Sequence, residues 1–178
     1  MSRTESVERG NHIFAVYPDK ETELDEAFKF LKDGFDKDEV VMLITDDISK
    51  DKIRARMSKE WNVDVKALES IDYIIIKAAE EWYFPYGAPD AERIKLHWIA
   101  LTEIVRVRNK KGLRVFADVS EFFKHGFVKE LINYEAALEP RFDFPLTAVC
   151  AYKSHDVAKL TNEQLKLLTK HHYLTWDQ

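Results

Sequence analysis

The sequence is poor in cysteine, glycine and proline, and it has no long apolar run. Its one cysteine, Cys150, excludes an internal disulfide framework and is typical of a reducing compartment. Residues 1–10 are polar, unlike a signal peptide, and the longest apolar runs, such as residues 40–44 and 73–76, are far shorter than the roughly 20 residues that a membrane helix needs. We therefore expect a cytoplasmic protein without a membrane partner.

Positive charge is also scarce, because the 178 residues carry a formal net charge of −5. This balance gives no general attraction for nucleic acid, so we expect no direct nucleic-acid partner. One basic cluster consists of Arg106, Arg108, Lys110, Lys111 and Arg114. We interpret it as solvated cations near the end of a helix, where the helix dipole favours them. The length predicts a flexible segment 1–10 followed by a single domain over residues 11–178.

Apolar runs of strand character alternate with segments of helical periodicity along the chain. Strands are predicted at residues 12–17, 39–45, 72–77, 113–117 and 145–151. Helices are predicted at residues 21–33 with Gly34 as the cap, 50–61 with 46–49 as the N-cap segment, 89–112 with Gly112 as the stop, 120–138, and 161–171 with a capping box at 161–164. Residues 62–70 show no clear pattern. Strands buried on both faces and separated by helices predict a three-layer α/β/α fold with a mainly parallel sheet.

The turn after the first strand argues against nucleotide hydrolysis. Residues 18–22 contain no glycine, whereas a phosphate-binding loop needs glycines for close backbone approach and a Lys followed by Ser or Thr at fixed spacing. Pro18 lacks a backbone donor, and Asp19 and Glu21 place negative charge where a phosphate would lie. We find no catalytic motif and expect neither enzyme activity nor a cofactor.

Ligands of open α/β sheets gather beyond the carboxyl ends of the strands, so the residues that follow each strand are the candidates for binding. These are Tyr17 with Asp19, Asp46 with Asp47, residues 80–83, Asp118 with Glu121, and Tyr152 with His155. Asp118 also fits a helix-capping role. The aromatic residues of segment 82–86 either cover the core or line an apolar pocket, and the sequence leaves both readings open.

Metal-ligating residues do not form a complete signature. Glu121 and His125 lie four residues apart on one helix face, and His171 and His172 add two imidazoles near the end of the chain. Because no third ligand can be named, we predict no metal. We interpret Cys150, inside an apolar strand, as a small buried hydrophobic residue.

Three stretches together resemble the MEDS family, a sensory domain shared by methanogen proteins and the methylotroph repressor of the dichloromethane operon. Residues 10–17, followed by 30–35 and 39–42, are similar to the family's opening strand with its histidine, a helix ending in Gly and an apolar residue, and an acid before the second strand. Residues 112–118 are similar to its Gly-Leu-Arg-Val strand. The third stretch combines residues 134–136, 145–152 and His171, similar to the family's Tyr-Glu, Cys-x-Tyr and terminal His pattern, with Ala151 where the family usually carries Gln.

This resemblance implies a RecA-like fold, related to the circadian-clock ATPases, with a degenerate phosphate loop. It also implies a stand-alone sensory domain that binds a small hydrocarbon-derived molecule and signals through a separate partner protein or through oligomerisation. The residues expected to contact the ligand are His12, Tyr17, Tyr83, Asp118 and Glu135. His12 and Glu135 are expected to orient one another, either as ligand contacts or as buried hydrogen-bonded structure.

Two alternative functions stay open. One is a divergent RecA-like nucleotide-binding protein or ATPase that uses another pocket. The other is a protein–protein interaction module built on residues 82–86 and the pair Phe122 and Phe123.

Overall fold

The chain folds around one parallel β-sheet. The computed structural model describes residues 7–46, 48–138, 140, 142–172 and 174–176. Residues 1–6 of the segment predicted to be flexible, and Asp47 of the predicted N-cap segment, lie outside the described residues. The strands are β1 (His12–Tyr17), β2 (Val40–Thr45), β3 (Ile74–Ala78), β4 (Leu113–Asp118), β5 (Leu146–Lys153) and β6 (Leu174–Trp176). Their order is β3-β2-β4-β5-β1-β6, and the paired strands run parallel, which confirms the predicted α/β fold of RecA-like type.

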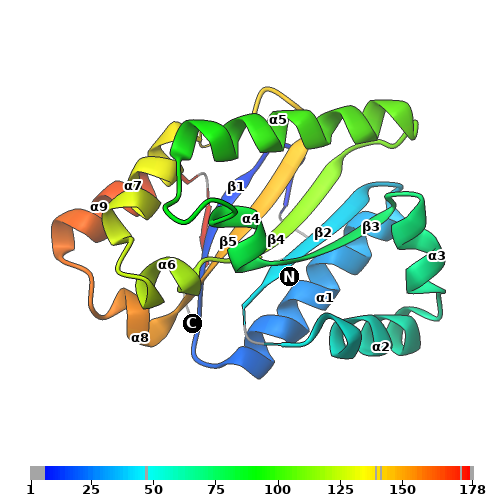
Figure 1. The fold of residues 1–178 in the computed structure, drawn as a ribbon, viewed down its shortest axis with the longest axis horizontal. Coiled ribbons are helices and arrows are strands. Elements are labelled where there is room, and N and C mark those ends of the chain that lie inside the picture. The colour runs from blue at the N-terminus through cyan, green and yellow to red at the C-terminus, as the bar shows by residue number, and fades with distance from the viewer. Residues whose placement is uncertain (1–6, 47, 139, 141, 173, 177–178) are drawn as a thin grey trace.

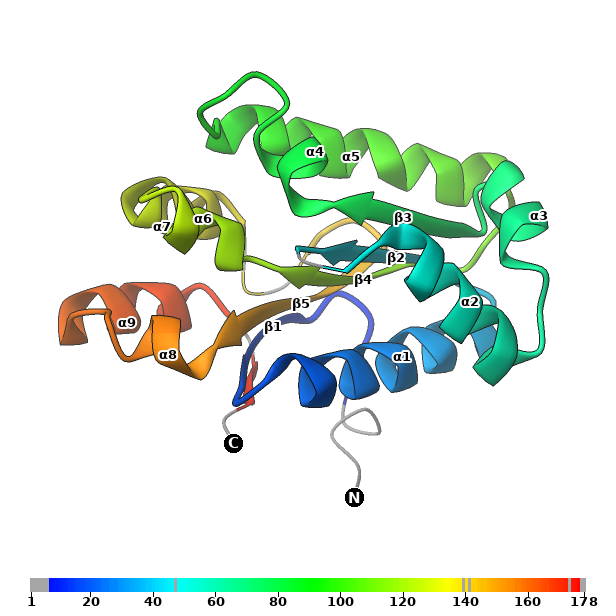
Figure 2. The ribbon, with the colours of Figure 1, turned by 60° about the horizontal axis from the view of Figure 1, so that its bottom comes forward.

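Helices cover both faces of this sheet, as Figures 1 and 2 show. The helices on one face are α1 (Lys20–Asp36), α2 (Lys50–Trp61) and α3 (Val65–Ser70). Those on the other are α4 (Ala79–Tyr83), α5 (Ala91–Val107), α6 (Ser120–Lys124), α7 (Val128–Ala137) and α9 (Asn162–Lys170), and the short α8 (Ser154–Val157) follows β5. In β1, Ile13 and Tyr17 pack on the α1 side, whereas Phe14 and Val16 pack on the α5 side. Side chains of a strand alternate between faces, so each face has its own apolar core.

Several element boundaries differ from the prediction because single residues adopt positive φ. The predicted helix 120–138 is divided into α6 and α7, with Gly126 at φ 73° between them. Helix α5 ends at Val107, before Gly112, and Asn109 follows with φ 53°. The unassigned segment 62–70 contains α3.

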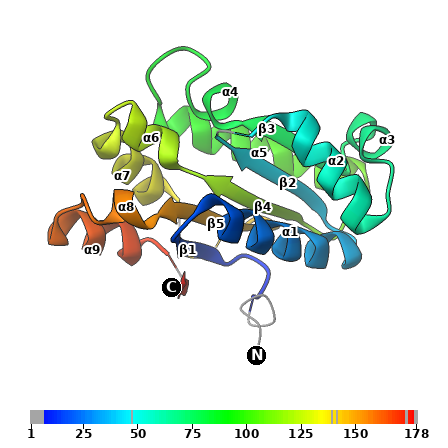
Figure 3. The same ribbon diagram turned by 90° about the horizontal axis from the view of Figure 1, so that it is seen from below.

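At the carboxyl-terminal end of the domain, the structure confirms one predicted feature and adds a strand that was not predicted. Thr161 and Gln164 each accept a hydrogen bond from the other's backbone N–H at the start of α9, which confirms the predicted capping box. The strand β6 was not predicted, because three residues are too few to show a period. It lies beside β1 at the edge of the sheet (Figure 3).

Gly34 lies inside α1 rather than at its end, and Arg114 explains why a glycine is needed there. A Cβ at position 34 would lie 2.6 Å from Cδ of Arg114 and 2.8 Å from Oε2 of Glu39. Arg114 is 3% exposed, and its Nε donates to Glu39 Oε2 at 2.6 Å while Nη1 donates to Asp33 Oδ2 at 2.6 Å. The interpretation of Arg114 as a solvated cation is therefore wrong, since it is a buried ion-pair partner of α1 and of the residue before β2.

No helix in the described part of the chain combines the length and the apolar character that crossing a bilayer demands.

Candidate functional site

A network of charged side chains lies where the carboxyl ends of β1, β2, β4 and β5 meet. At its centre, Nζ of Lys20 lies 2.6 Å from Oδ1 of Asp46 and 2.8 Å from Oδ2 of Asp118. Lys20 also donates to Oε1 of Glu23, one turn further along α1, at 2.8 Å. The ends of parallel strands share one edge of the sheet, which is why residues so far apart in sequence meet here.

Asp46 and Asp118 have further donors on the far side of this network. Asp46 Oδ2 accepts from Oγ of Ser120 at 2.7 Å and from Nζ of Lys153 at 2.6 Å. Asp118 Oδ1 accepts from the backbone N–H of Ser120 at 2.7 Å, a local bond to the residue two positions ahead, but the N-cap residue of α6 is Val119 and not Asp118. We call this group the edge cluster; its members are Lys20, Glu23, Asp46, Asp118, Ser120 and Lys153.

The charged side chains of the edge cluster neutralise one another. Burial disfavours the charged form of Lys20, but Asp118 and Glu23 outweigh burial and raise its pKa. Burial would likewise raise the pKa of Asp46, but the ammonium groups of Lys153 and Lys20 hold it well below its usual range. Burial and the nearby Asp118 carboxylate raise the pKa of Glu23 to about 9, so Glu23 keeps its proton at neutral pH. Two ammonium groups then face two carboxylates, and the cluster ties four strand ends together.

Two open hollows lie at the carboxyl ends of β3 and β4 and share two residues. The first, of about 430 Å³, is lined by Asp46, Ala78, Glu80, Glu121, Lys124 and His125. The second, of about 360 Å³, is lined by Glu80, Phe84, Gly87, His125 and Phe127. Glu80 and His125 thus stand between a charged compartment and an aromatic one. We call the two together the edge hollow.

The edge hollow also contains the predicted pair of Glu121 and His125, with a third group that the sequence could not supply. Nε2 of His125 lies 3.3 Å from Oε1 of Glu80 and 3.3 Å from Oε2 of Glu121. Lys124 forms an ion pair with Glu121 at 2.9 Å. His125 is the C-cap residue of α6, directly before Gly126, and its ring contacts Glu80 of α4.

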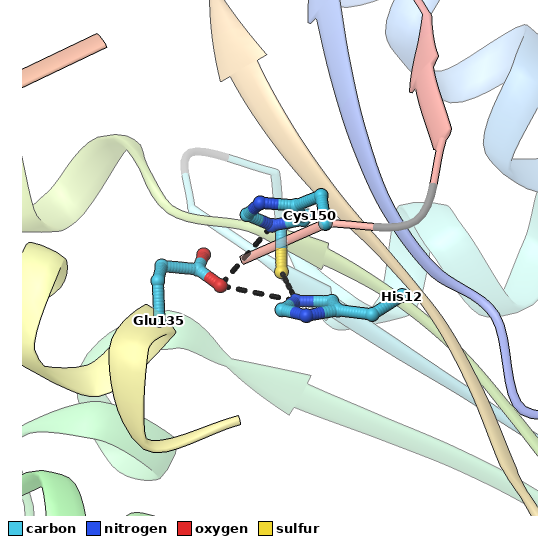
Figure 4. Close-up of side chains that lie close together, drawn as sticks. His12, Glu135 and Cys150 are labelled. Atoms are coloured by element: carbon cyan, nitrogen blue, oxygen red, sulfur yellow. Dashed lines mark hydrogen bonds and ion pairs between the residues drawn. The ribbon is translucent and has the colours of Figure 1, made fainter. Parts of the chain in front are cut away.

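A second polar group is enclosed between the sheet and the helices on the α5 side. Nε2 of His12 lies 3.0 Å from Oε2 of Glu135 and 3.4 Å from Sγ of Cys150, as the close-up in Figure 4 shows. Nε2 of His172 lies 3.2 Å from the same Glu135 oxygen, and the hydroxyl of Tyr152 donates to Glu135 Oε1 at 2.9 Å. We call these five residues the buried cluster.

Burial dominates the protonation of this cluster. Burial and the neighbouring His172 lower the pKa of His12, although Glu135 opposes them. Burial alone would raise the pKa of Glu135, but His172 and His12 hold it well below its usual range. Burial raises the pKa of the Cys150 thiol and of the Tyr152 hydroxyl, and Glu135 raises both further. The cluster therefore holds one carboxylate among imidazole, thiol and phenol groups.

A third hollow, of about 400 Å³, lies between α1 and α2, away from the strand ends; among its lining residues are Phe28, Arg56 and Trp61. Arg56 there is already engaged, with its guanidinium carbon 4.3 Å from the centre of the Phe28 ring and a hydrogen bond to Glu60 at 2.6 Å. Arg56 also forms an ion pair with Asp25, so both carboxylates that line this hollow already pair with Arg56.

The whole sequence was also compared with known proteins. Residues 11–173 match the family model described as MEDS, the methanogen/methylotroph DcmR sensory domain. The chain belongs to the MEDS family. This confirms the resemblance noted from the sequence and gives the chain a sensory or regulatory role. No curated protein matches the sequence significantly.

The structure of this MEDS domain separates the predicted ligand-contact residues into several places. His12 and Glu135 meet in the buried cluster. Asp118 belongs to the edge cluster. Tyr83 is buried in α4, with its ring centre 4.9 Å from that of Phe122, under the aromatic wall of the edge hollow. Tyr17 packs in the core on the opposite face of the sheet. Their role as ligand contacts stays a prediction.

Four residues that are central in the structure were either missed or left unconnected on sequence grounds. Lys20 lies in the turn that was tested only against a phosphate-binding loop. Lys153 is the last residue of β5, so the rule on strand ends could have found it. Cys150 and His172 were noted but not connected with His12, because nothing in their spacing shows that they meet. The aromatic segment 82–86 is largely packed inward, with Tyr86 as its exposed member at 78%.

Proposed function

We propose that this MEDS domain senses a small, largely apolar molecule with one polar group, and that the molecule binds in the edge hollow. The observation that carries the proposal is the pairing of an aromatic compartment with a charged one at the carboxyl edge of a parallel sheet. Small-molecule sites combine apolar walls with a few polar groups in this way. A hydrocarbon derivative, the class that the family resemblance suggests, fits this description.

The walls of the hollow assign a role to each part of such a ligand. Phe84 and Phe127, whose ring centres are 5.6 Å apart, would cover the apolar body. His125 and Glu80 would face the polar group, since the His125 imidazole can donate or accept a hydrogen bond. Tyr83 lies in contact range of Phe84, with 6.2 Å between ring centres, so it would support the wall rather than touch the ligand.

The proposed role is binding without catalysis, and the edge cluster supports this choice over an ATPase. Lys20 is the first residue of α1, beyond the carboxyl end of β1, but three carboxyl groups already surround its ammonium group. The N-terminus of α1 is capped by the carboxylate of Asp19, which accepts from the backbone N–H of Thr22 at 2.8 Å. A phosphate would have to displace these carboxylates. A titration with magnesium-ATP is therefore expected to show no binding, and saturable binding would revive the divergent ATPase.

The signal would pass to a separate partner or to a second copy of the chain. Gly87, which lines the hollow, lies four residues before the start of α5, and α5 exposes Leu96 at 62%, Ile99 at 42% and Val107 at 64%. Apolar side chains on one helix surface favour protein contacts. Light scattering with and without a bound compound would show whether self-association is the output. An unchanged mass in both states would leave a separate partner.

Ligand binding can be tested directly with C1 and chlorinated compounds. We expect at least one of them, at millimolar concentration, to raise the melting temperature and to shift the NMR resonances of Phe84 and His125. His125→Gln should weaken this binding by removing the imidazole from the hollow. His155→Gln is the matched control, because that imidazole is 65% exposed and lies outside the hollow.

Two results would count against the proposal. One is the absence of any response across the compound set in protein that is folded by circular dichroism. The other is an equal loss of affinity in His155→Gln and His125→Gln, which would show that the hollow is not where the compound binds.

A further inference from the structure

The buried cluster gathers four potential metal ligands from four separate parts of the chain. They are Nε2 of His12 in β1, Oε2 of Glu135 in α7, Sγ of Cys150 in β5, and Nε2 of His172 between α9 and β6. All four atoms lie within 4.8 Å of one another, and all four residues are buried. The proposed ligand hollow shares none of these residues.

Each ring nitrogen of His12 lies beside a hydrogen-bond acceptor. Nδ1 lies 3.0 Å from the backbone oxygen of His171, and Nε2 lies 3.0 Å from Oε2 of Glu135. Both neighbours are acceptors, whereas a neutral imidazole has one N–H. With the proton on Nδ1, Nε2 can accept from the Cys150 thiol at 3.4 Å, but its lone pair also faces the Glu135 carboxylate oxygen at 3.0 Å. A cation at this point would remove the conflict.

His172 repeats the same arrangement. Its Nδ1 lies 2.5 Å from the backbone oxygen of Leu168, and its Nε2 lies 3.2 Å from Oε2 of Glu135. Within the described residues, neither His172 Nε2 nor Glu135 Oε2 has a hydrogen-bond partner of good geometry. Buried polar atoms of this kind call for an explanation, and an ion is one. Two imidazoles held by backbone carbonyls at Nδ1 present both Nε2 lone pairs to one point, as metal-bound histidines do.

The spacing of the ligand atoms suits a small tetrahedral ion. Bonds of about 2.0–2.3 Å place the ligand atoms of a tetrahedral zinc site roughly 3.3–3.8 Å apart. The distances from His12 Nε2 to Cys150 Sγ, 3.4 Å, and from His172 Nε2 to Glu135 Oε2, 3.2 Å, are close to that range.

From this convergence we propose that His12, Glu135, Cys150 and His172 bind one divalent ion of the zinc class. Two imidazoles, a thiolate and a carboxylate form a borderline-soft set of ligands that zinc accepts and that magnesium and calcium do not favour. Binding releases the thiol proton of Cys150 to solvent, and the sulfur then ligates as a thiolate. Tyr152, through its bond to Glu135 Oε1, fixes the carboxylate that ligates with the other oxygen.

The ion would hold the two ends of the domain together. His12 lies in the second strand from the sheet edge, and His172 directly precedes the segment that leads into the edge strand β6. A bond network through one ion therefore joins β1, β5, α7 and the last segment. Because ligands distant in sequence converge only in the folded chain, metal binding adds to the stability of the fold.

Cobalt(II) is the probe for this site, because it reports its ligands by absorption. The purified full chain, stripped with chelator and titrated with Co²⁺, should bind one equivalent. It should show a thiolate-to-cobalt charge-transfer band and the intense visible bands of tetrahedral geometry. Added Zn²⁺ should abolish both. Cys150→Ser should lose the charge-transfer band while keeping the fold by circular dichroism, and zinc should raise the melting temperature of the wild type more than that of the variant.

The control is His125→Gln, which changes the exposed group of Glu80, Glu121 and His125 in the edge hollow. This variant should keep the full cobalt spectrum. Loss of the spectrum in His125→Gln but not in Cys150→Ser would place the ion in the edge hollow and overturn the proposal. So would a folded wild type that binds no stoichiometric Co²⁺ or Zn²⁺. Neither result depends on whether a hydrocarbon derivative binds, so the two proposals fail independently.

Discussion

Replacing Gly34 by Ala should destabilise this protein, although the same change usually stabilises a helix. In a helix interior, Gly→Ala is worth roughly 0.5–1 kcal/mol of added stability. Here the new Cβ would lie 2.6 Å from Cδ and 2.7 Å from Nε of Arg114, and 2.8 Å from Oε2 of Glu39. Arg114 cannot move aside freely, because it is 3% exposed and hydrogen-bonded to Glu39 and Asp33.

The magnitude follows from the ion pair that must be disrupted. Breaking a buried ion pair costs about 3–5 kcal/mol, so after the helix gain the net loss should be about 2–4 kcal/mol. With a urea m value of about 2 kcal/mol per M, the unfolding midpoint should fall by roughly 1–2 M. Urea unfolding followed by tryptophan fluorescence and circular dichroism measures this shift.

A matched background isolates the steric cause. The double variant Arg114→Val/Glu39→Ala removes the three atoms that obstruct position 34, so adding Gly34→Ala to it should stabilise by about 0.5–1 kcal/mol. The difference between the two backgrounds is the coupling energy of Gly34 with the pair. An increase in stability when Gly34→Ala is made in the wild type would refute the reasoning.

Three further outcomes are expected. The pKa of Glu23 in the folded state is raised to about 9, so above about pH 5 the folded state holds one more proton than the unfolded state. The contribution of Glu23 to the free energy of unfolding should therefore fall by up to about 1.4 kcal/mol per pH unit until the pH approaches 9. Glu23→Gln should therefore gain stability relative to wild type as pH rises from 5 to 8 in thermal melts, and parallel curves would show that Glu23 ionises normally. Tyr152→Phe should cost about 1–3 kcal/mol in denaturant unfolding, because it leaves Glu135 Oε1 without its donor in the core; Tyr86→Phe, at a residue 78% exposed, should change nothing, and equal effects would remove the argument from burial. Asn62 ends α2 with φ 54°, so Asn62→Gly should be neutral or stabilising and Asn62→Val should cost roughly 1–2 kcal/mol by the same assay; a harmless valine would contradict the left-handed cap.

The sequence by itself determined the type of fold and most of its elements. Of the six strands in the described part of the chain, five follow from apolar runs, and most of the described helices follow from helical periods, which are properties of neighbouring residues. It also indicated that Asp46 and Asp118, at strand ends, would lie at the carboxyl edge. The resemblance to the MEDS family was confirmed, and His12 and Glu135, which were expected to orient one another, lie 3.0 Å apart.

Only the tertiary structure decided which chemistry these residues share. The strand order β3-β2-β4-β5-β1-β6 is set by packing between distant segments, and it brings Lys20 and Lys153 to Asp46. The same packing joins Cys150 and His172 to His12, although 138 residues separate His12 from Cys150. No local period records such distances, since they arise when helices and strands far apart in sequence close over a common core.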